Sequence, residues 1–398
     1  MSAIVFIGAG NSGHAMAADC KLGGAEVRMY EFPEYADGIR ELAKHRAIKL
    51  WGPERNAKGF RRNGTAVLDM VTTDIAQAMK GAKHVVFTCR ANAYEKAAQL
   101  AVPYLEDGQV ISFMPDNFGS FILRRVMRES GCTKKILVGG WTSMPFGSRI
   151  THRAADFNQV YIMYRAVQLR YDTLPSCDAG AYIEAMADYP CLDTIDPLRG
   201  DTMLDINFSN VNPLLHVPAT LYNAGAIENW GIIEDVGSKE VFFDIYRHGF
   251  SPSISNIQWA QYQEECAIAK ALGVGIQPYD KDIFYTRSNI LGVEFMGDGY
   301  ALPLDHSIPA EDWMIYMPGE RFDLNTRYIT EDLPIGCRMY HDLGVIAGVQ
   351  TPVVDAMLVA ASVMKGVDYF TQGFSPEHIG IGGLSPSALL DYLKYGTI

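Results

Sequence analysis

Two separated segments of the chain carry side chains that could move protons or bind a carboxylate. The first, Phe208 to Pro218, contains Asn212 and His216, which share one face of a helix because they are four residues apart. Pro213 is compatible with that helix if it lies in the first turn. A histidine beside a neutral amide suits proton transfer near neutral pH. The alternative is a buried, hydrogen-bonded histidine with a purely structural role.

The second segment, Asp323 to Pro334, contains Arg327 and, near its end, the adjacent acids Glu331 and Asp332 in a modestly apolar stretch. The planar fork of Arg327 could grip a substrate carboxylate. Either Glu331 or Asp332 could orient a histidine and stabilise its charged form. The alternative is an exposed loop held by salt bridges.

A glycine-rich motif near the N-terminus could bind a dinucleotide. In order, its residues are Gly8, Ala9, Gly10, Asn11, Ser12 and Gly13. The motif follows a strand-like run at 3–7 and opens a helical segment at 11–22, which is the context that dinucleotide binding requires. Gly8 permits a tight turn, Gly10 lets the backbone approach a pyrophosphate, and Gly13 lets the helix pack closely on the sheet. The N–H groups at the helix start, at Asn11 and Ser12, would attract the anion.

Glu31 ends the next predicted strand, 25–31, about where an acid meets the adenosine ribose. A carboxylate there repels a 2′-phosphate, so NAD is favoured over NADP, although nearby Arg28 keeps NADP open. Two loops that follow predicted strands are candidate walls of the cofactor site, because ligands bind beyond the carboxyl ends of parallel strands. Plain surface loops are the alternative. The candidate residues in these loops are Cys89, Arg90 and Pro115.

The elements that must position these residues form two patterns. Short apolar runs alternate with helical segments through about residue 150, which predicts an α/β fold with a doubly wound parallel sheet. A strand-like run follows at 157–167. From about Met203 the apolar spacing is mainly helical, most clearly at 257–272 and 352–364. We therefore expect a dinucleotide-binding domain over residues 1–200 and a mainly α-helical domain over residues 201–398.

Composition excludes several functional classes. The formal net charge of -12 argues against a nucleic-acid partner. No apolar stretch reaches the roughly 18 residues that span a bilayer, and no secretory signal opens the chain. Seven scattered cysteines fit reduced thiols in a cytoplasm better than a disulfide framework or a zinc site. We therefore expect a cytoplasmic protein without a metal site or a membrane partner.

Four motifs together resemble the octopine/nopaline (opine) dehydrogenase family, including its N-(1-carboxyethyl)norvaline-type enzymes, over nearly the full chain. They read GAGNSGHA, SNVNPLLHVPATLYNAG, LNTRYITEDLPIG and LGVIAGVQTPVVDAM. The resemblance implies an N-terminal Rossmann domain, a helical C-terminal domain, and catalysis in the cleft between them. It also implies that His216 is the acid/base, that Asp332 is its partner, and that Arg327 and Asn212 lie in the substrate site.

One turn departs from the family pattern. Ser148 stands where a cysteine is common, and Thr142 stands about where members that use arginine carry an acid. This departure argues against a strongly cationic amino acid substrate, and Thr142 is a candidate substrate contact.

The activity that the resemblance implies is NADH-dependent condensation of an amino acid with a 2-oxo acid, pyruvate being expected, followed by reduction of the imine. The reverse oxidation is implied as well. The alternatives are a 2-hydroxy acid or ketone reductase of the same plan and a non-catalytic dinucleotide-binding sensor. The oligomeric state is left open, with a homodimer as one expectation.

Overall fold

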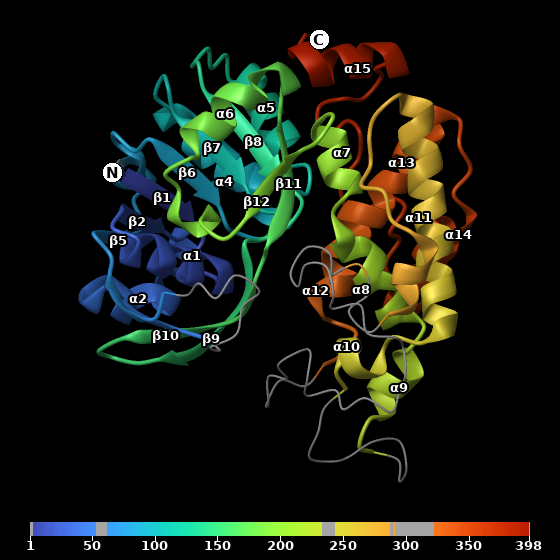
Figure 1. Ribbon diagram of the computed structural model, residues 1–398, viewed down its shortest axis with the longest axis horizontal. Helices are drawn as coiled ribbons and strands as arrows, with labels where there is room; N and C mark the ends of the chain where they lie inside the picture. Colours follow the sequence, from blue (N-terminus) through green and yellow to red (C-terminus); the bar gives the residue numbers. More distant parts are fainter. Residues whose placement is uncertain (1–2, 53–61, 233–242, 287–289, 291–321, 398) are drawn as a thin grey trace. The chain divides into compact units, whose positions relative to one another are not determined.

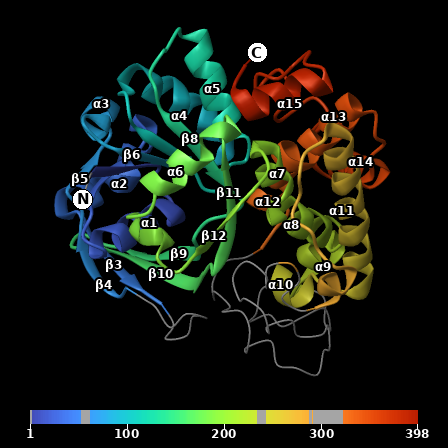
Figure 2. The same cartoon turned by 45° about the horizontal axis from the view of Figure 1, so that its top comes forward.

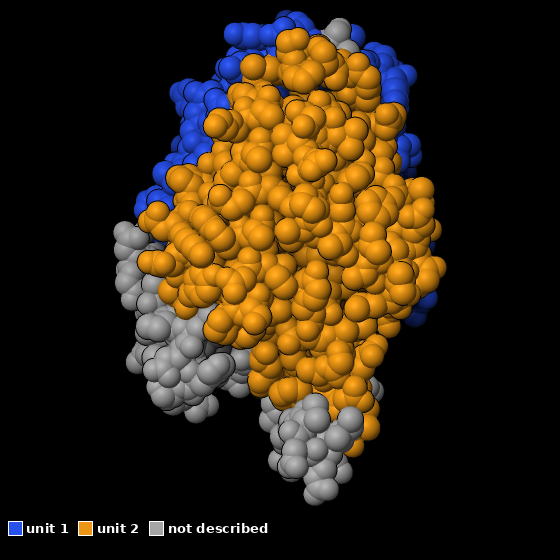
Figure 3. Space-filling model, turned by 90° about the vertical axis from the view of Figure 1, so that its right-hand side faces the viewer, with its two compact units in different colours: residues 1–207, 294–297, 391–398 blue, residues 208–293, 298–390 orange. Residues whose placement is uncertain are grey.

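The computed structural model describes residues 3–52, 62–232, 243–286, 290 and 322–397, which form two compact units (Figure 1). Unit 1 contains residues up to Asn207 and the last residues from Asp391 onward. Unit 2 contains the described residues from Phe208 to Leu390, and Figure 3 shows part of its surface. Within the described ranges, no helix is long and apolar enough to cross a membrane.

Unit 1 is built on an eight-stranded sheet with the order β12-β11-β8-β7-β6-β1-β2-β5. The run from β8 to β5 is entirely parallel, which confirms the predicted parallel sheet, whereas β11 pairs antiparallel with β8. Every residue of β1, β6 and β7 is buried, as expected for strands covered on both faces. The strands are β1 (Ala3–Ile7), β2 (Glu26–Tyr30), β5 (Met70–Thr72), β6 (His84–Phe87), β7 (Val110–Phe113), β8 (Leu137–Trp141), β11 (Gln168–Thr173) and β12 (Asp196–Arg199).

Helices cover both faces of this sheet (Figures 1 and 2). Neighbouring residues of β7 show the two faces, because side chains alternate along a strand. Ser112 lies 2.8 Å from the hydroxyl of Tyr182 in α6, whereas the ring of Phe113 packs closely against Gly119 of α5. The helices of unit 1 with the clearest roles are α1 (Asn11–Leu22), α2 (Ala36–His45), α3 (Ile75–Met79), α4 (Tyr94–Ala101), α5 (Gly119–Glu129) and α6 (Ala179–Ala185).

A second sheet of four strands, β4-β3-β10-β9, packs against α1 and was not predicted. Only the strand-like run at 157–167 was anticipated, and it forms β10. The pattern gives little signal elsewhere, because three of the five β3 residues are exposed or partly exposed and the end of β9 is exposed. The strands are β3 (Ala47–Trp51), β4 (Gly64–Val67), β9 (Phe146–Arg153) and β10 (Asn158–Arg165).

Unit 2 is helical, as predicted, and is organised around α8 (Val211–Leu221). All residues of α8 except Asn212 are buried. The helix contacts α11, α12 and α14, so its apolar side chains form the centre of the unit 2 core. The other helices of this unit are α9 (Ala224–Asn229), α10 (Ile245–His248), α11 (Pro252–Leu272), α12 (Arg327–Thr330), α13 (Arg338–Ala347), α14 (Pro352–Lys365) and the first half of α15 (Pro386–Tyr395).

The division between the units falls after Asn207, whereas the sequence pattern placed the domain boundary near residue 200. Asn207, near the end of α7 (Met203–Phe208), is tied to unit 1 because its side chain donates to Asp116 and accepts from the backbone N–H of Phe118. The last residues of the chain also belong to unit 1, where the ring of Tyr392 lies 6.2 Å from that of Phe121.

Candidate active site

The glycine loop between β1 and α1 needs its glycines for three different reasons. Gly8 has φ +110°, and a Cβ atom there would lie 2.7 Å from the backbone N of Cys89. A Cβ atom on Gly13 would lie 2.0 Å from the carbonyl oxygen of Gly8. A Cβ atom on Gly10 would meet nothing within 4 Å, and Gly10 is exposed. The structure therefore leaves open space at the position where a pyrophosphate would approach the backbone.

The partly buried Thr88 and the buried His14, which the sequence analysis did not single out, hold this loop in place. The hydroxyl of Thr88 donates to the carbonyl of Gly8 at 2.9 Å. His14 is completely buried, with Nδ1 3.0 Å from the carbonyl of Gly10 and Nε2 2.9 Å from the amide of Asn158 in β10. Because the Asn158 amide nitrogen can only donate, Nε2 accepts and Nδ1–H donates to the loop. No local sequence signal marks His14, since its partner lies 144 residues away.

Glu31 lies directly beside the glycine loop. Its carboxylate accepts hydrogen bonds from the backbone N–H of Ala9 at 2.9 Å and from that of Phe32 at 2.8 Å. These bonds fix the carboxylate and leave further lone pairs that can accept ribose hydroxyls. This is the position that an acid has in dinucleotide-binding folds.

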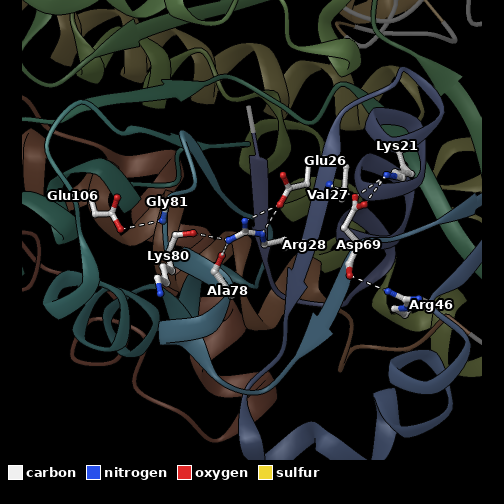
Figure 4. Close-up of polar contacts among 10 residues, drawn as sticks. All are labelled: Lys21, Glu26, Val27, Arg28, Arg46, Asp69, Ala78, Lys80, Gly81 and Glu106. Carbon is white, nitrogen blue, oxygen red and sulfur yellow. Dashed lines mark hydrogen bonds and ion pairs between the residues drawn. The ribbon is translucent and has the colours of Figure 1, made fainter. Parts of the chain in front are cut away.

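The guanidinium of Arg28 is occupied elsewhere (Figure 4). Its Nε and Nη2 atoms donate to Glu26, and Nη1 donates to the carbonyls of Ala78 and Lys80. Arg28 therefore holds the end of α3 against β2. Glu26 thus balances the charge of Arg28, and protein groups accept its hydrogen bonds, so a bound nucleotide is not needed to explain its position.

The remaining predicted cofactor residues have different surroundings. Cys89 directly abuts Gly8, and Arg90 after it is exposed. Asn11 is exposed, but its side chain accepts a hydrogen bond from the backbone N–H of Ile150, while Ser12 is partly exposed at the start of α1. Pro115 is buried after β7, and its carbonyl accepts from the hydroxyl of Tyr94. The loops of Cys89 and Pro115 both follow the carboxyl ends of parallel strands, and their roles stay predictions.

In unit 2 the structure brings together the two residues for which a His–Asp pair was expected. Nδ1 of His216 lies 2.6 Å from Oδ2 of Asp332, and the two residues are 3% and 5% exposed. Since an ionised carboxylate only accepts, the proton of the neutral imidazole is on Nδ1, which leaves the lone pair on Nε2. This arrangement can take up a proton at Nε2 and stabilise the resulting imidazolium.

Local structure explains why these residues meet. Helix α8 begins where the side chain of Asn210 accepts from the N–H of Asn212, and Pro213 lies in the first turn, as predicted. Asp332 precedes a π-helical turn, η9 (Leu333–Cys337), that contacts α8. A Cβ atom on Gly336 would lie 2.3 Å from the ring of Pro213, so only glycine permits this close packing.

The imidazole is enclosed by two tyrosines that the sequence analysis did not identify. The ring of Tyr328 stacks on His216 with centroids 3.6 Å apart and planes inclined by 18°. The hydroxyl of Tyr246 lies 2.8 Å from Nε2. Tyr328 immediately follows Arg327 in the LNTRYITEDLPIG motif, whereas Tyr246 lies in a segment without any recognised pattern.

The predicted substrate contacts differ in accessibility. Arg327 is exposed, and its guanidinium has no hydrogen-bond partner within the described residues. Asn212, one turn before His216, is partly exposed. In unit 1, Thr142 follows β8 and is completely buried, with a hydroxyl that has no partner in the described part of the chain. A substrate role for Thr142 therefore stays a prediction.

Acid is expected to weaken unit 1 through His14. Burial, together with the charge of Arg153, lowers the pKa of His14 to about 4. Below pH 6.5 the unfolded chain takes up a proton that the folded chain refuses, so stability falls as the pH drops toward 4. The loss from pH 7 to pH 5 is about 2 kcal/mol for this group.

The measurement is urea unfolding of the parent chain and of the His14→Asn variant at both pH values. The asparagine amide can still donate to the loop but does not titrate. Burial raises the pKa of Asp116 and of Asp172 to about 6, which acts in the opposite direction, but these groups are common to both proteins and cancel. Equal pH dependence of the two proteins would contradict the prediction.

Among the described residues, no group of three or more His, Cys, Asp and Glu side chains is arranged to hold a metal ion. The side chains described above therefore define two kinds of site. Unit 1 offers a glycine loop with an adjacent carboxylate, and unit 2 offers a buried acid/base pair and the Arg327 guanidinium, which lies within electrostatic range of the carboxylates of Glu331 and Asp332.

Comparison with known proteins relates both units to one group of enzymes. Residues 199–365 match the α-helical domain of NAD/NADP octopine/nopaline dehydrogenases. The chain is 27% identical to opine dehydrogenase from Arthrobacter sp. (strain 1C) over 395 residues, which cover 96% of each chain. Octopine dehydrogenase solved with NADH and L-arginine shares the fold, with a TM-score of 0.68 and 18% identity over 98% of each chain. The same enzyme solved with NADH and pyruvate gives 0.67 and 19%, again over 98% of each chain.

These relatives confirm the resemblance at the level of the family, while its N-(1-carboxyethyl)norvaline-type branch stays a prediction. The two-unit fold, the helical-domain match and the full-length relative agree with one another. Residues 199–365 match the α-helical domain of the octopine/nopaline dehydrogenases, and over nearly its full length the chain is similar to opine dehydrogenases, which are NAD(P)-dependent oxidoreductases.

Proposed function

We propose that this protein uses NADH to join the amino group of an amino acid to a 2-oxo acid, with pyruvate as the oxo acid, and also catalyses the reverse oxidation. One observation carries the proposal: a buried His216–Asp332 pair lies on the same unit as the exposed Arg327, whose guanidinium makes no hydrogen bond within the described residues. An acid/base and a carboxylate-binding group are what this condensation requires.

The glycine loop fits a dinucleotide because the space beside Gly10 is open. A Cβ atom on Gly10 would meet no protein atom within 4 Å, so a bound pyrophosphate can approach the backbone there. Gly8, Gly10 and Gly13 with the adjacent N-terminus of α1 would hold the pyrophosphate, and Glu31 would accept the ribose hydroxyls. When bound, the reduced nicotinamide supplies a hydride. NAD is proposed over NADP because the Glu31 carboxylate repels a 2′-phosphate and the Arg28 guanidinium is already occupied.

His216 handles the proton that the condensation requires. The amine and the oxo acid first form a carbinolamine, which must lose its hydroxyl as water to become an imine. Asp332 keeps the proton of the neutral ring on Nδ1, so Nε2 is the nitrogen that exchanges protons with the substrate. Positioned acid–base catalysis of this kind accelerates a step by roughly 100- to 10,000-fold.

Arg327 is proposed to bind the carboxylate of the oxo acid. An exposed guanidinium without a hydrogen-bond partner in the described chain can form a two-pronged contact with a carboxylate. Asn212, the one residue of α8 that is not buried, is proposed as a second contact. Thr142 carries no charge, so the amino acid substrate is proposed to have a side chain that is not strongly cationic.

The test is NADH oxidation with pyruvate, measured with and without a panel of amino acids. We expect turnover only when an amine is present, a secondary-amine product by mass spectrometry, slower turnover with arginine than with neutral amino acids, and slower turnover with NADPH. Lactate formation from pyruvate alone would instead identify a 2-hydroxy acid reductase. NADH binding without turnover on any carbonyl substrate would support a dinucleotide-binding sensor.

A further inference from the structure

In this structure the Nε2 atom of His216 is hydrogen-bonded to a tyrosine. The hydroxyl of Tyr246 lies 2.8 Å from Nε2, while Asp332 accepts the proton of Nδ1 at 2.6 Å. Because the lone pair of the neutral ring is on Nε2, this nitrogen accepts the hydroxyl proton of Tyr246. Both imidazole nitrogens are thus hydrogen-bonded by side chains of unit 2.

The position of Tyr246 is fixed by local structure. Helix α10 is a single turn, and Asp244 caps it by accepting from the backbone N–H of Tyr246 at 2.9 Å. The backbone N–H of Asp244 in turn donates to Nδ1 of His248 at 2.9 Å. The ring of Tyr246 also makes an edge contact with Phe250, with centroids 5.9 Å apart. The hydroxyl is therefore held at Nε2 by a closed turn and by packing.

Substrate has easier access to the phenol than to the imidazole. His216 is 3% exposed and is covered on one face by the stacked ring of Tyr328, whereas Tyr246 is half-buried. The hydroxyls of Tyr246 and Tyr328 lie 3.4 Å apart, and both phenols are within electrostatic range of the Arg327 guanidinium. A 2-oxo acid held at Arg327 through its carboxylate would therefore bring its adjacent oxygen toward Tyr246.

We propose that Tyr246 relays protons between His216 and the substrate oxygen, an inference that rests on the proposed function. During condensation the carbinolamine hydroxyl takes the phenol proton as its C–O bond breaks. The nitrogen lone pair forms the C=N bond of the protonated imine, and water leaves. The Tyr246 oxygen takes the Nε2 proton of the imidazolium, which returns His216 to the neutral form seen in the structure.

The reverse reaction uses the same groups. Water gives one proton to the Tyr246 oxygen as it attacks the carbon of the protonated imine, and Tyr246 passes its own proton to Nε2. Asp332 stabilises the imidazolium that results. In both directions, Tyr246 is therefore a neutral phenol before and after the reaction.

The experiment replaces Tyr246 with phenylalanine, which removes the hydroxyl and keeps the ring contacts. We expect kcat for opine formation to fall about 10- to 100-fold, less than for loss of His216, because a water molecule can bridge the gap between Nε2 and the substrate. NADH affinity should not change. The pH–rate limb that reports on the imidazole should move to higher pH, because the lost hydrogen bond favoured the neutral ring. The matched control is Tyr222→Phe, the same change at an exposed tyrosine of unit 2.

Three results would overturn the relay. They are unchanged kcat with an unchanged pH profile, a lower KM for the oxo acid at unchanged kcat, and a lower kcat without a shift of the profile. The second would mean that the phenol only occupies Nε2 until substrate displaces it, and the third would mean a packing defect. Opine formation by the parent chain is measured first, so that failure of the relay is distinguishable from failure of the proposed function.

Discussion

Replacing His216 with asparagine is expected to lower kcat for opine formation by roughly 100- to 10,000-fold while NADH affinity stays unchanged. Asparagine is chosen because its amide can still donate to Asp332. Alanine would leave that carboxylate buried without a partner, and such a loss typically destabilises a protein by about 3–5 kcal/mol. The nucleotide loop belongs to unit 1, so NADH binding serves as the internal control. The measurements are steady-state kinetics with saturating substrates and NADH binding by fluorescence titration.

Asp332→Asn is the companion variant. Its amide can donate to Nδ1, which would place the proton of the neutral ring on Nε2 and leave no lone pair there. If the two residues act as one unit, the double variant should lose about as much activity as the His216 variant alone. Losses that multiply would mean that the residues act independently, and normal turnover in His216→Asn would remove this histidine from the mechanism.

Two glycines of the same loop should respond to alanine in opposite ways. Gly13→Ala is expected to destabilise unit 1 by roughly 3 kcal/mol or more, because its Cβ atom would lie 2.0 Å from a backbone oxygen. Gly10→Ala should leave stability within about 0.5 kcal/mol, because the methyl group meets nothing within 4 Å and φ is an ordinary -78°. The affinity of the Gly10→Ala variant for NADH should nevertheless fall at least about tenfold, because the added methyl group fills the space through which the pyrophosphate approaches the backbone.

Gly38→Ala in α2 is the matched control, since a Cβ atom there also meets no other atom within 4 Å. This variant should keep both stability and NADH affinity close to the parent values. Urea unfolding and NADH titration of all three variants give the comparison. Full NADH affinity in Gly10→Ala would show that the dinucleotide does not use this loop.

The parts of the site that could be predicted from the sequence depend on local patterns. The strand, the glycine motif and the following helix are contiguous, so composition and spacing were enough to place Gly8 and Gly13. The shared face of Asn212 and His216 likewise follows from helical spacing, and α8 confirms it. The meeting of His216 with Asp332, which lies 116 residues away, was implied by the family resemblance rather than by any local signal.

The parts that could not be predicted depend on tertiary contacts. His14 has its role because Asn158 reaches it from β10, and the packing of this strand's sheet against α1 could not be predicted from the sequence. Tyr246 lies in a one-turn helix, which is too short to give any periodicity. The Arg28 guanidinium donates hydrogen bonds to two backbone carbonyls at the end of α3, and the positions of backbone carbonyls cannot be predicted from a sequence pattern.

The return of the last residues to unit 1 has a consequence for how the protein unfolds. Unit 2 lies between Phe208 and Leu390, and the chain before and after this span belongs to unit 1, so both ends of the span are anchored there. While unit 1 is intact, the unfolded span of unit 2 is a closed loop with restricted chain entropy. Unfolding of unit 2 therefore gains less entropy than unfolding of an open chain would. Cutting the polypeptide once after Gly383, in the turn before α15, would open that loop without removing a residue or breaking a helix, and the helical unit should then melt at a lower temperature.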